Sequence, residues 1–83
     1  MTYAITWEPS AVDLASRFLA DDPTGLRALV AALDALADDP RPSDAFPFGA
    51  TGLLRLRVGQ YRVIYEVDDV ATTVVVMHIG RSV

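Results

Sequence analysis

The sequence predicts an α+β domain in which two antiparallel helices pack on a small, mainly antiparallel sheet, in the order β-α-α-β-β-β. Three observations indicate this fold. Apolar residues recur at helical spacing between residues 11 and 36, they alternate with other residues from Leu53 onward, and a short alternating segment precedes the first helix. With 83 residues, of which 52% are hydrophobic, residues 1–83 are expected to form one domain with a modest core.

The composition excludes several ways of supporting such a small fold. There is no cysteine, so neither disulfides nor a cysteine-based zinc site can supplement the core. Met1–Ser10 lacks the basic start and long apolar run of a secretory signal, and the apolar stretch around Val74–Met77 falls far short of the roughly 20 residues that span a membrane. A soluble, cytoplasmic protein that does not bind membranes is expected.

The first strand and helix follow from the N-terminal pattern. Thr2–Trp7 alternates and is rich in β-formers, which predicts a strand that ends at Glu8-Pro9. Ser10 is expected to cap a helix that stops at Asp21-Asp22. Its apolar face is formed by Ala11, Leu14, Ala15, Phe18 and Leu19.

A second helix begins at Asp22-Pro23, where the aspartate is predicted to be the N-cap and the proline the first helical residue. Asp38–Pro40 is expected to end this helix, and Arg41–Gly52 to be an irregular connection because it contains prolines and glycines. The short link at Asp22 predicts antiparallel helices. The apolar stripe of the second helix is Leu26, Leu29, Val30, Leu33 and Leu36.

The C-terminal half is predicted to form three strands. Leu53–Val58 and Tyr61–Val67 alternate on either side of Gly59-Gln60, which suits a hairpin with a type II′ turn. After a turn at Asp68–Ala71, Thr72–Ile79 is β-branched and apolar on both sides, as expected of a central strand. The hairpin residues predicted to pack on the helices are Leu54, Leu56, Val58, Tyr61, Val63, Tyr65 and Val67.

The net charge of −4, from eleven acidic residues and seven arginines, argues on average against a nucleic-acid partner. The distribution of charge is uneven, however. Residues 1–44 hold eight acids, whereas residues 53–65 hold Arg55, Arg57 and Arg62 and no acid. With Gly59-Gln60 as the loop, Arg57 lies opposite Arg62, and Arg55 shares their face.

Like charges directly opposite on a sheet destabilise it by up to about 1 kcal/mol, so another interaction is expected to offset this cost. Arginine matches phosphate oxygens with forked donors and keeps its charge, which favours a phosphate site formed by Arg55, Arg57 and Arg62. The alternative is a solvated sheet face on which Glu66 and Asp68 partly compensate the arginines.

His78, the only histidine, is the natural candidate for acid-base chemistry near neutral pH, although a lone histidine in a strand is more often a hydrogen-bonded structural residue. Tyr61 and Tyr65 are interpreted as core-facing aromatics whose hydroxyls reach the edge. The sequence contains no metal-ligand spacing, phosphate-binding glycine loop or nucleophile elbow, so neither a metal nor a cofactor is expected.

Three segments, Asp39–Arg41, Gly52–Asp69 and Val74–Arg81, together strongly resemble the RelE/ParE superfamily of type II toxins. The motif Arg-Leu-Arg-Val-Gly-x-Tyr-Arg-Val-Ile-Tyr at residues 55–65 is specific in that family, and the element order also matches. The resemblance implies a RelE-like fold. For the RelE branch it further implies a ribosome-dependent endoribonuclease that cuts messenger RNA in the ribosomal A site and is held inactive by a cognate antitoxin.

The resemblance also implies roles for individual residues. Arg62 matches the hairpin arginine that contacts the region of the scissile phosphate, Arg55 matches a basic residue on the preceding strand, and Arg57 matches its basic neighbour. Arg81 loosely matches the basic residue after the last strand. The chain departs from the family at Leu53, where some active members are basic, and it shows no tyrosine after Arg81, where the family has one important for cleavage.

Metal-free RNA cleavage requires that the 2′-hydroxyl lose a proton, that the pentacoordinate phosphorus be stabilised and that the departing 5′-oxygen gain a proton. Guanidinium groups can stabilise charge but are poor bases. The base is left open among His78, a tyrosine hydroxyl, Glu66 and a ribosomal group. The candidate catalytic residues are Arg55, Arg57, Arg62, Arg81 and His78.

Three functions therefore remain as hypotheses. The first is the ribosome-dependent endoribonuclease, with the ribosome and messenger RNA as partners. The second is a ParE-like toxin that poisons DNA gyrase without being a nuclease, which the missing tyrosine favours. The third is an attenuated member that keeps only antitoxin binding. All three predict a cognate antitoxin in a toxin–antitoxin hetero-oligomer, with acidic side chains of the antitoxin close to Arg55, Arg57 and Arg62.

Overall fold

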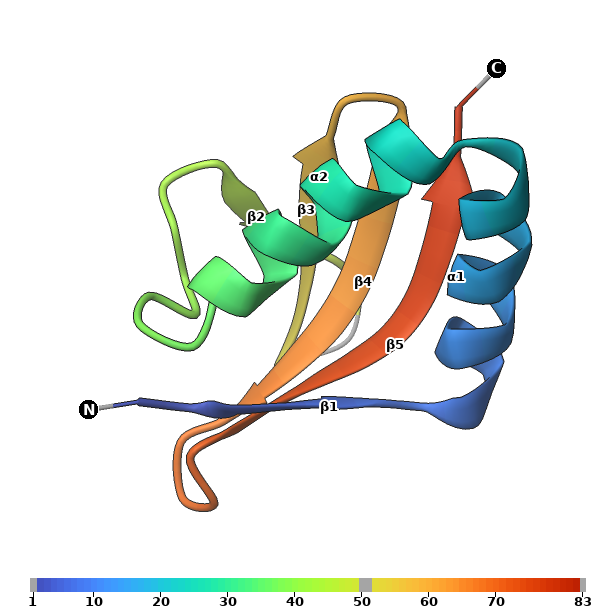
Figure 1. Ribbon diagram of the computed structural model, residues 1–83. Coiled ribbons are helices and arrows are strands. Elements are labelled where there is room, and N and C mark those ends of the chain that lie inside the picture. Colours follow the sequence, from blue (N-terminus) through green and yellow to red (C-terminus); the bar gives the residue numbers. More distant parts are fainter. Residues whose placement is uncertain (1, 50–51, 83) are drawn as a thin grey trace.

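The computed structural model describes residues 2–49 and 52–82, which form two helices on one face of a five-stranded sheet (Figure 1). The elements in chain order are β1 (Ala4–Trp7), α1 (Pro9–Asp21), α2 (Pro23–Ala35), β2 (Ala45–Pro47), β3 (Leu53–Val58), β4 (Tyr61–Asp68) and β5 (Thr73–Arg81). The predicted α+β class with helices packed on a mainly antiparallel sheet is confirmed.

The sheet order is β1-β5-β4-β3-β2. β1 pairs with β5 in parallel, and the other neighbouring strands are antiparallel. Both helices lie in the connection from β1 to β2, and they cover the same face of the sheet, with α2 turning back from the end of α1 (Figure 1). β5 lies between β1 and β4, as its apolar character on both sides predicted.

The core lies between the helices and the sheet. Its fully or nearly buried members come from both helices and from β3, β4 and β5: Ala11, Leu26, Leu29, Leu33, Leu36, Leu56, Tyr61, Val63, Tyr65, Val67, Val74, Val76 and Ile79. The predicted inner face of the hairpin is confirmed, because Leu54 and Val58, the two members outside this set, also pack against it.

The hairpin register is also confirmed. Val58 pairs with Tyr61 and Arg57 with Arg62, and Gly59 has a φ of 60°, as the first position of a type II′ turn requires. A side chain at this position would be strained, which explains why glycine occupies it.

Several predicted boundaries were wrong. The segment Arg41–Gly52 is not wholly irregular, because it contains β2, which pairs with β3 along the sheet edge. Ser10 does not cap α1; the helix begins at Pro9 with Glu8 as N-cap, and no side chain satisfies the cap. α2 ends at Ala35 and continues only as a turn, rather than reaching Asp38.

Candidate functional site

The face of the sheet turned away from the helices, here called the open face, gathers four of the five predicted site residues. Arg57 pairs with Arg62, while Ile64 on β4 pairs with Arg55 on one side and with His78 on the other. Directly paired residues point to the same side of a sheet, so the three arginines and the histidine share the open face. All four are exposed.

His78 reaches the open face because β5 is irregular beside it. Tyr65 pairs with Val76 and Ile64 with His78, so that Met77 is an extra residue in a β-bulge. Strict alternation from the buried Val76 would turn His78 toward the helices. The bulge reverses this, and Ile79 is the next buried residue instead.

Two of the arginines and His78 line a shallow pocket of about 200 Å³ together with Phe48, Ile64 and Gly80. The ends of Arg62 and His78 converge above Gly80, where a Cβ atom would lie 3.6 Å from Nη2 of Arg62 and 3.7 Å from Nε2 of His78. Because Gly80 has no side chain, a ligand atom has room between the permanently charged guanidinium of Arg62 and the imidazole of His78.

The positive charge of this pocket is not neutralised within the described residues. The ion pairs found in residues 2–49 and 52–82 are Arg41–Asp69 and Arg81–Asp21, and neither involves an open-face arginine. Arg57 donates only a long hydrogen bond, of 3.4 Å, from Nε to the carbonyl of Gly59. Guanidinium groups held close together without carboxylates favour an anionic ligand.

Arg81, the fifth predicted residue, is not brought together with the other four. It lies on the helix-covered side of the sheet, where its Nη1 donates to Asp21 Oδ2. Its guanidinium carbon lies 5.0 Å from the centre of the Phe18 ring. The hydrogen bond from Arg81 to Asp21 is the main cause that raises the pKa of Arg81, and the neighbouring Tyr61 hydroxyl adds to it. This arginine ties the end of β5 to α1.

Tyr61 and Tyr65 are core-facing aromatics, as predicted, and their hydroxyls are already engaged. The Tyr61 hydroxyl donates to Asp22 Oδ2 at 2.9 Å, and that of Tyr65 donates to the carbonyl of Pro40 at 2.8 Å. Burial raises the pKa of Tyr61 and, more strongly, that of Tyr65, to about 12. Among the side chains considered as a base, His78 and Glu66 lie on the open face, whereas these two tyrosines do not.

Sequence reasoning missed two aromatic residues beside the arginines. Phe46 pairs with Arg55 across β2 and β3, and Phe48 lines the same pocket as Arg55 and Arg62. Pro47 lies between them, and a proline in a segment that also contains glycines is typical of a loop, which conceals the strand. Their spacing of two residues is the signal that could have revealed a strand, since proline is tolerated on edge strands such as β2.

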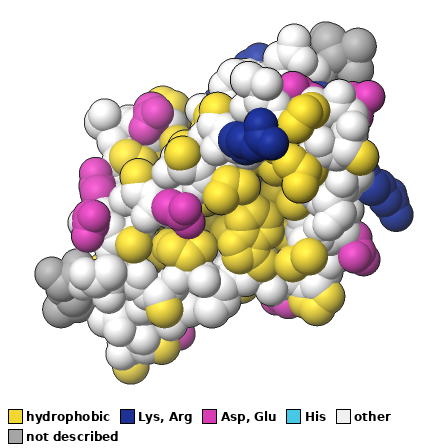
Figure 2. All heavy atoms as spheres, viewed as in Figure 1, with side chains coloured by type: hydrophobic (Ala, Val, Ile, Leu, Met, Phe, Trp, Pro, Cys, Tyr) yellow, Lys and Arg dark blue, Asp and Glu magenta, His cyan; other side chains and the backbone are white. Residues whose placement is uncertain are grey.

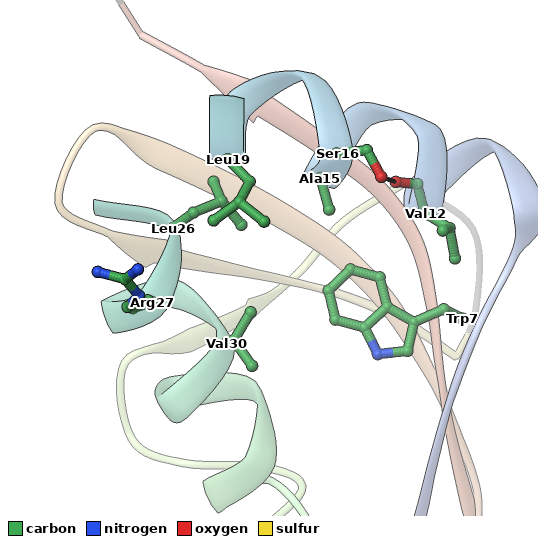
Figure 3. A pocket seen from close by; sticks show the side chains of 8 residues that line it. All are labelled: Trp7, Val12, Ala15, Ser16, Leu19, Leu26, Arg27 and Val30. Atoms are coloured by element: carbon green, nitrogen blue, oxygen red, sulfur yellow. Dashed lines mark hydrogen bonds between the residues drawn. The ribbon is translucent and has the colours of Figure 1, made fainter. Parts of the chain in front are cut away.

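The helix-bearing face carries a different surface, an apolar groove of about 650 Å³ between β1, α1 and α2. Figure 2 shows the hydrophobic side chains gathered in a hollow at the centre of this face. Figure 3 shows that Trp7 lies across the groove from Val30, with the Arg27 guanidinium at the rim. The groove is lined by Trp7, Val12, Ala15, Ser16, Leu19, Leu26, Arg27 and Val30.

Neither a metal cluster nor a helix that could cross a membrane is found in the part of the chain that is described. No group of three histidine, cysteine, aspartate or glutamate side chains there could hold a metal ion. Neither helix is long and apolar enough to cross a bilayer.

Comparison with known proteins gives a consistent result. The model of the ParE toxin of the type II toxin–antitoxin system parDE matches residues 11–82. No curated protein sequence matches the chain.

Solved structures match almost the whole chain. The toxin–antitoxin complex RelBE2 from Mycobacterium tuberculosis contains a chain with 26% identity and a TM-score of 0.82, covering 98% of this chain and 99% of that chain. A chain of the archaeal RelE–RelB complex from Pyrococcus horikoshii has 25% identity and a TM-score of 0.83, and the match covers 98% of this chain and 96% of that chain. The isolated RelE toxin of E. coli shares the fold, with 19% identity and a TM-score of 0.83. The match covers 98% of this chain and 85% of that chain.

Proposed function

The chain belongs to the ParE toxin family, within the RelE/ParE superfamily of type II toxin–antitoxin toxins, and we propose that it is a ribosome-dependent endoribonuclease. It cuts messenger RNA in the cytoplasm and is neutralised by a cognate antitoxin. The observation that carries this proposal is the convergence of Arg55, Arg62 and His78 on one open pocket without carboxylate partners among the described residues.

The chemistry of RNA cleavage matches the groups in this pocket. The 2′-oxygen attacks phosphorus and the bond from phosphorus to the 5′-oxygen breaks, so one proton must leave the 2′-hydroxyl and another must reach the 5′-oxygen. Arg62 and Arg55 stabilise the negative charge that develops on the phosphate oxygens. His78 transfers one of the protons. Glu66 or a ribosomal group supplies the second transfer.

The test is cleavage of a defined messenger RNA on purified ribosomes, followed by primer extension. Arg62→Ala is expected to lower the cleavage rate by a factor of about 100 to 1,000, as expected when a charge-stabilising donor is lost. Arg17→Ala is the matched control, because Arg17 is an exposed arginine on α1, on the opposite face of the sheet from the pocket. This variant is expected to cleave normally. Intact messenger RNA after incubation with the wild type would refute the proposal.

A second candidate, poisoning of DNA gyrase, is favoured by one observation, the match to the ParE family model. A supercoiling assay with purified gyrase separates the two functions. Inhibition of supercoiling by the wild type, with messenger RNA left intact on ribosomes, would favour gyrase as the target.

The antitoxin is proposed to occupy the apolar groove on the helix-bearing face. The similar chains from M. tuberculosis and P. horikoshii were solved in complexes with RelB antitoxins or as part of RelBE2. Leu19 and Val12, each 46% exposed, and Val30, 36% exposed, line the same groove, and exposed apolar residues gathered in one patch mark an interaction site. An amphipathic segment with apolar anchors and an acidic residue opposite Arg27 would fit this surface.

Leu19→Glu should therefore weaken antitoxin binding, measured by calorimetry with the purified partner. Val70→Glu is the control, because Val70 is 99% exposed in the turn between β4 and β5 and does not line the groove. Equal affinity of the two variants would exclude the groove. Unchanged affinity after charge reversal of Arg55, Arg57 and Arg62 would likewise exclude the predicted acidic contacts to the open face.

A further inference from the structure

We propose that Phe46 and Phe48 form a stacking platform for the bases of single-stranded RNA, beside the phosphate site of Arg55 and Arg62. This inference rests on the proposed endoribonuclease function and adds the groups that would hold the bases of the substrate. It assigns a role to the two aromatic residues that the cleavage chemistry does not use.

The exposure of both rings is the first observation. Phe46 is 58% exposed and Phe48 is 43% exposed, in a chain that has only three phenylalanines. Burying a phenylalanine side chain stabilises a fold by roughly 1.5–3 kcal/mol, and neither residue takes full advantage of this. Two large exposed aromatics, one in the edge strand β2 and one directly after it, indicate a binding surface.

Their position relative to the arginines is the second observation. Phe46 is directly paired with Arg55, so a row of side chains crosses four strands on the open face in the order Phe46, Arg55, Ile64 and His78. Phe48 is two residues further along, on the same side, and lines the pocket with Arg55 and Arg62. Neighbouring side chains in such a row lie about 5 Å apart at Cβ. A nucleotide with its phosphate at the arginines therefore has its base within reach of a phenylalanine ring.

The combination of rings and cations on a sheet face selects the class of ligand. Unpaired bases stack on exposed aromatic side chains while arginines hold the backbone, whereas the bases of a duplex are hidden in their own stack. Phenylalanine carries no hydrogen-bonding group, so the platform is expected to accept any base at these positions. The face thus fits an unpaired stretch of messenger RNA with little sequence preference.

The test measures binding of a labelled single-stranded RNA oligonucleotide to the purified toxin by fluorescence anisotropy at several salt concentrations. Phe46→Leu and Phe48→Leu keep apolar side chains but remove the ring, and each is expected to weaken binding by about 5- to 150-fold. Phe46→Tyr should bind like the wild type, because it restores the ring. Val70→Leu, at a distant exposed apolar site, should have no effect.

The salt dependence separates stacking from charge. Arg62→Ala should reduce the slope of log affinity against log salt by roughly 0.7, as for one lost phosphate contact on a single strand, whereas Phe46→Leu should leave the slope unchanged. Failure of the wild type to bind, equal binding by the leucine variants, or equal affinity for duplex RNA would each overturn the platform.

Failure of the platform and failure of the proposed function give different results. If ribosomal cleavage requires Arg62 but the leucine variants bind and cleave normally, only the platform is wrong. If the leucine variants lose RNA binding while no ribosomal cleavage occurs with the wild type, the platform stands and the endoribonuclease function is wrong.

Discussion

Replacing Gly25 with alanine should destabilise this protein, although the same change in most helices is stabilising. Gly25 lies in the first turn of α2, where its backbone N–H donates to Asp22 Oδ1 at 3.1 Å. The other carboxylate oxygen of Asp22 accepts from the Tyr61 hydroxyl at 2.9 Å. A Cβ atom on Gly25 would lie only 2.1 Å from Asp22 Oδ2, so the carboxylate would have to move.

The expected magnitude follows from the bonds that this movement breaks. Loss of an aspartate cap costs about 1 kcal/mol, and loss of the Tyr61 hydrogen bond about another 1 kcal/mol. The gain in helix propensity from glycine to alanine returns up to about 1 kcal/mol. The net change is a loss of about 1 kcal/mol, which for a domain of this size lowers the Tm by roughly 4–8 °C.

The assay is thermal unfolding followed by circular dichroism for the wild type, Gly25→Ala, Asp22→Ala and the double variant. Once Asp22 is alanine the steric conflict is gone, so Gly25→Ala should then raise the Tm. Tyr61→Phe provides a control that removes only the hydroxyl, and it should lower the unfolding free energy by about 1 kcal/mol. An equal rise in Tm from Gly25→Ala in both backgrounds would refute this account of the cap.

Three further predictions concern the Arg41–Asp69 ion pair, the arginines of the open face and the core. The hydrogen bond from Arg41, and after it the one from the Tyr3 hydroxyl, lowers the pKa of Asp69 to about 2. The ionised carboxylate therefore contributes stability above about pH 4 that is lost as the pH falls toward 2, and the Tm difference between wild type and Asp69→Asn should shrink over that window. Arg57→Gln should raise the unfolding free energy by up to about 1 kcal/mol in low salt by relieving repulsion from Arg62, and an equal gain in 1 M salt would contradict this origin. Ala11, which is 0% exposed, should not tolerate leucine, and a loss of about 1–3 kcal/mol is expected in urea unfolding; an unchanged midpoint would show that α1 can move away from the sheet.

Much of the fold could be predicted because its signals are local. The 3.6-residue spacing of the apolar residues indicated both helices, and the period of two indicated the hairpin. Gly59 indicated the turn and therefore the register that places Arg57 opposite Arg62. The arginine face followed from that register without any knowledge of the rest of the chain.

The short strand β2 was not predictable in the same way. A three-residue segment with a proline has little strand propensity of its own, and it is ordered by pairing with β3 along the sheet edge. Missing β2 also meant missing the place of Phe46 beside Arg55. The exposed aromatic side of the site was therefore visible only in the assembled sheet.

The positions of His78 and Arg81 depended on tertiary structure for a physical reason. The alternation that a sequence shows assumes a regular ladder, whereas the bulge at Met77 forms between two strands and reverses the direction of every later side chain in β5. The sequence alone determined the two helices, the hairpin and its three arginines. Pairing between distant segments decided that His78 joins those arginines while Arg81 turns to Asp21 on the other side, since strand register and ion pairs across 60 residues are not encoded in local periodicity.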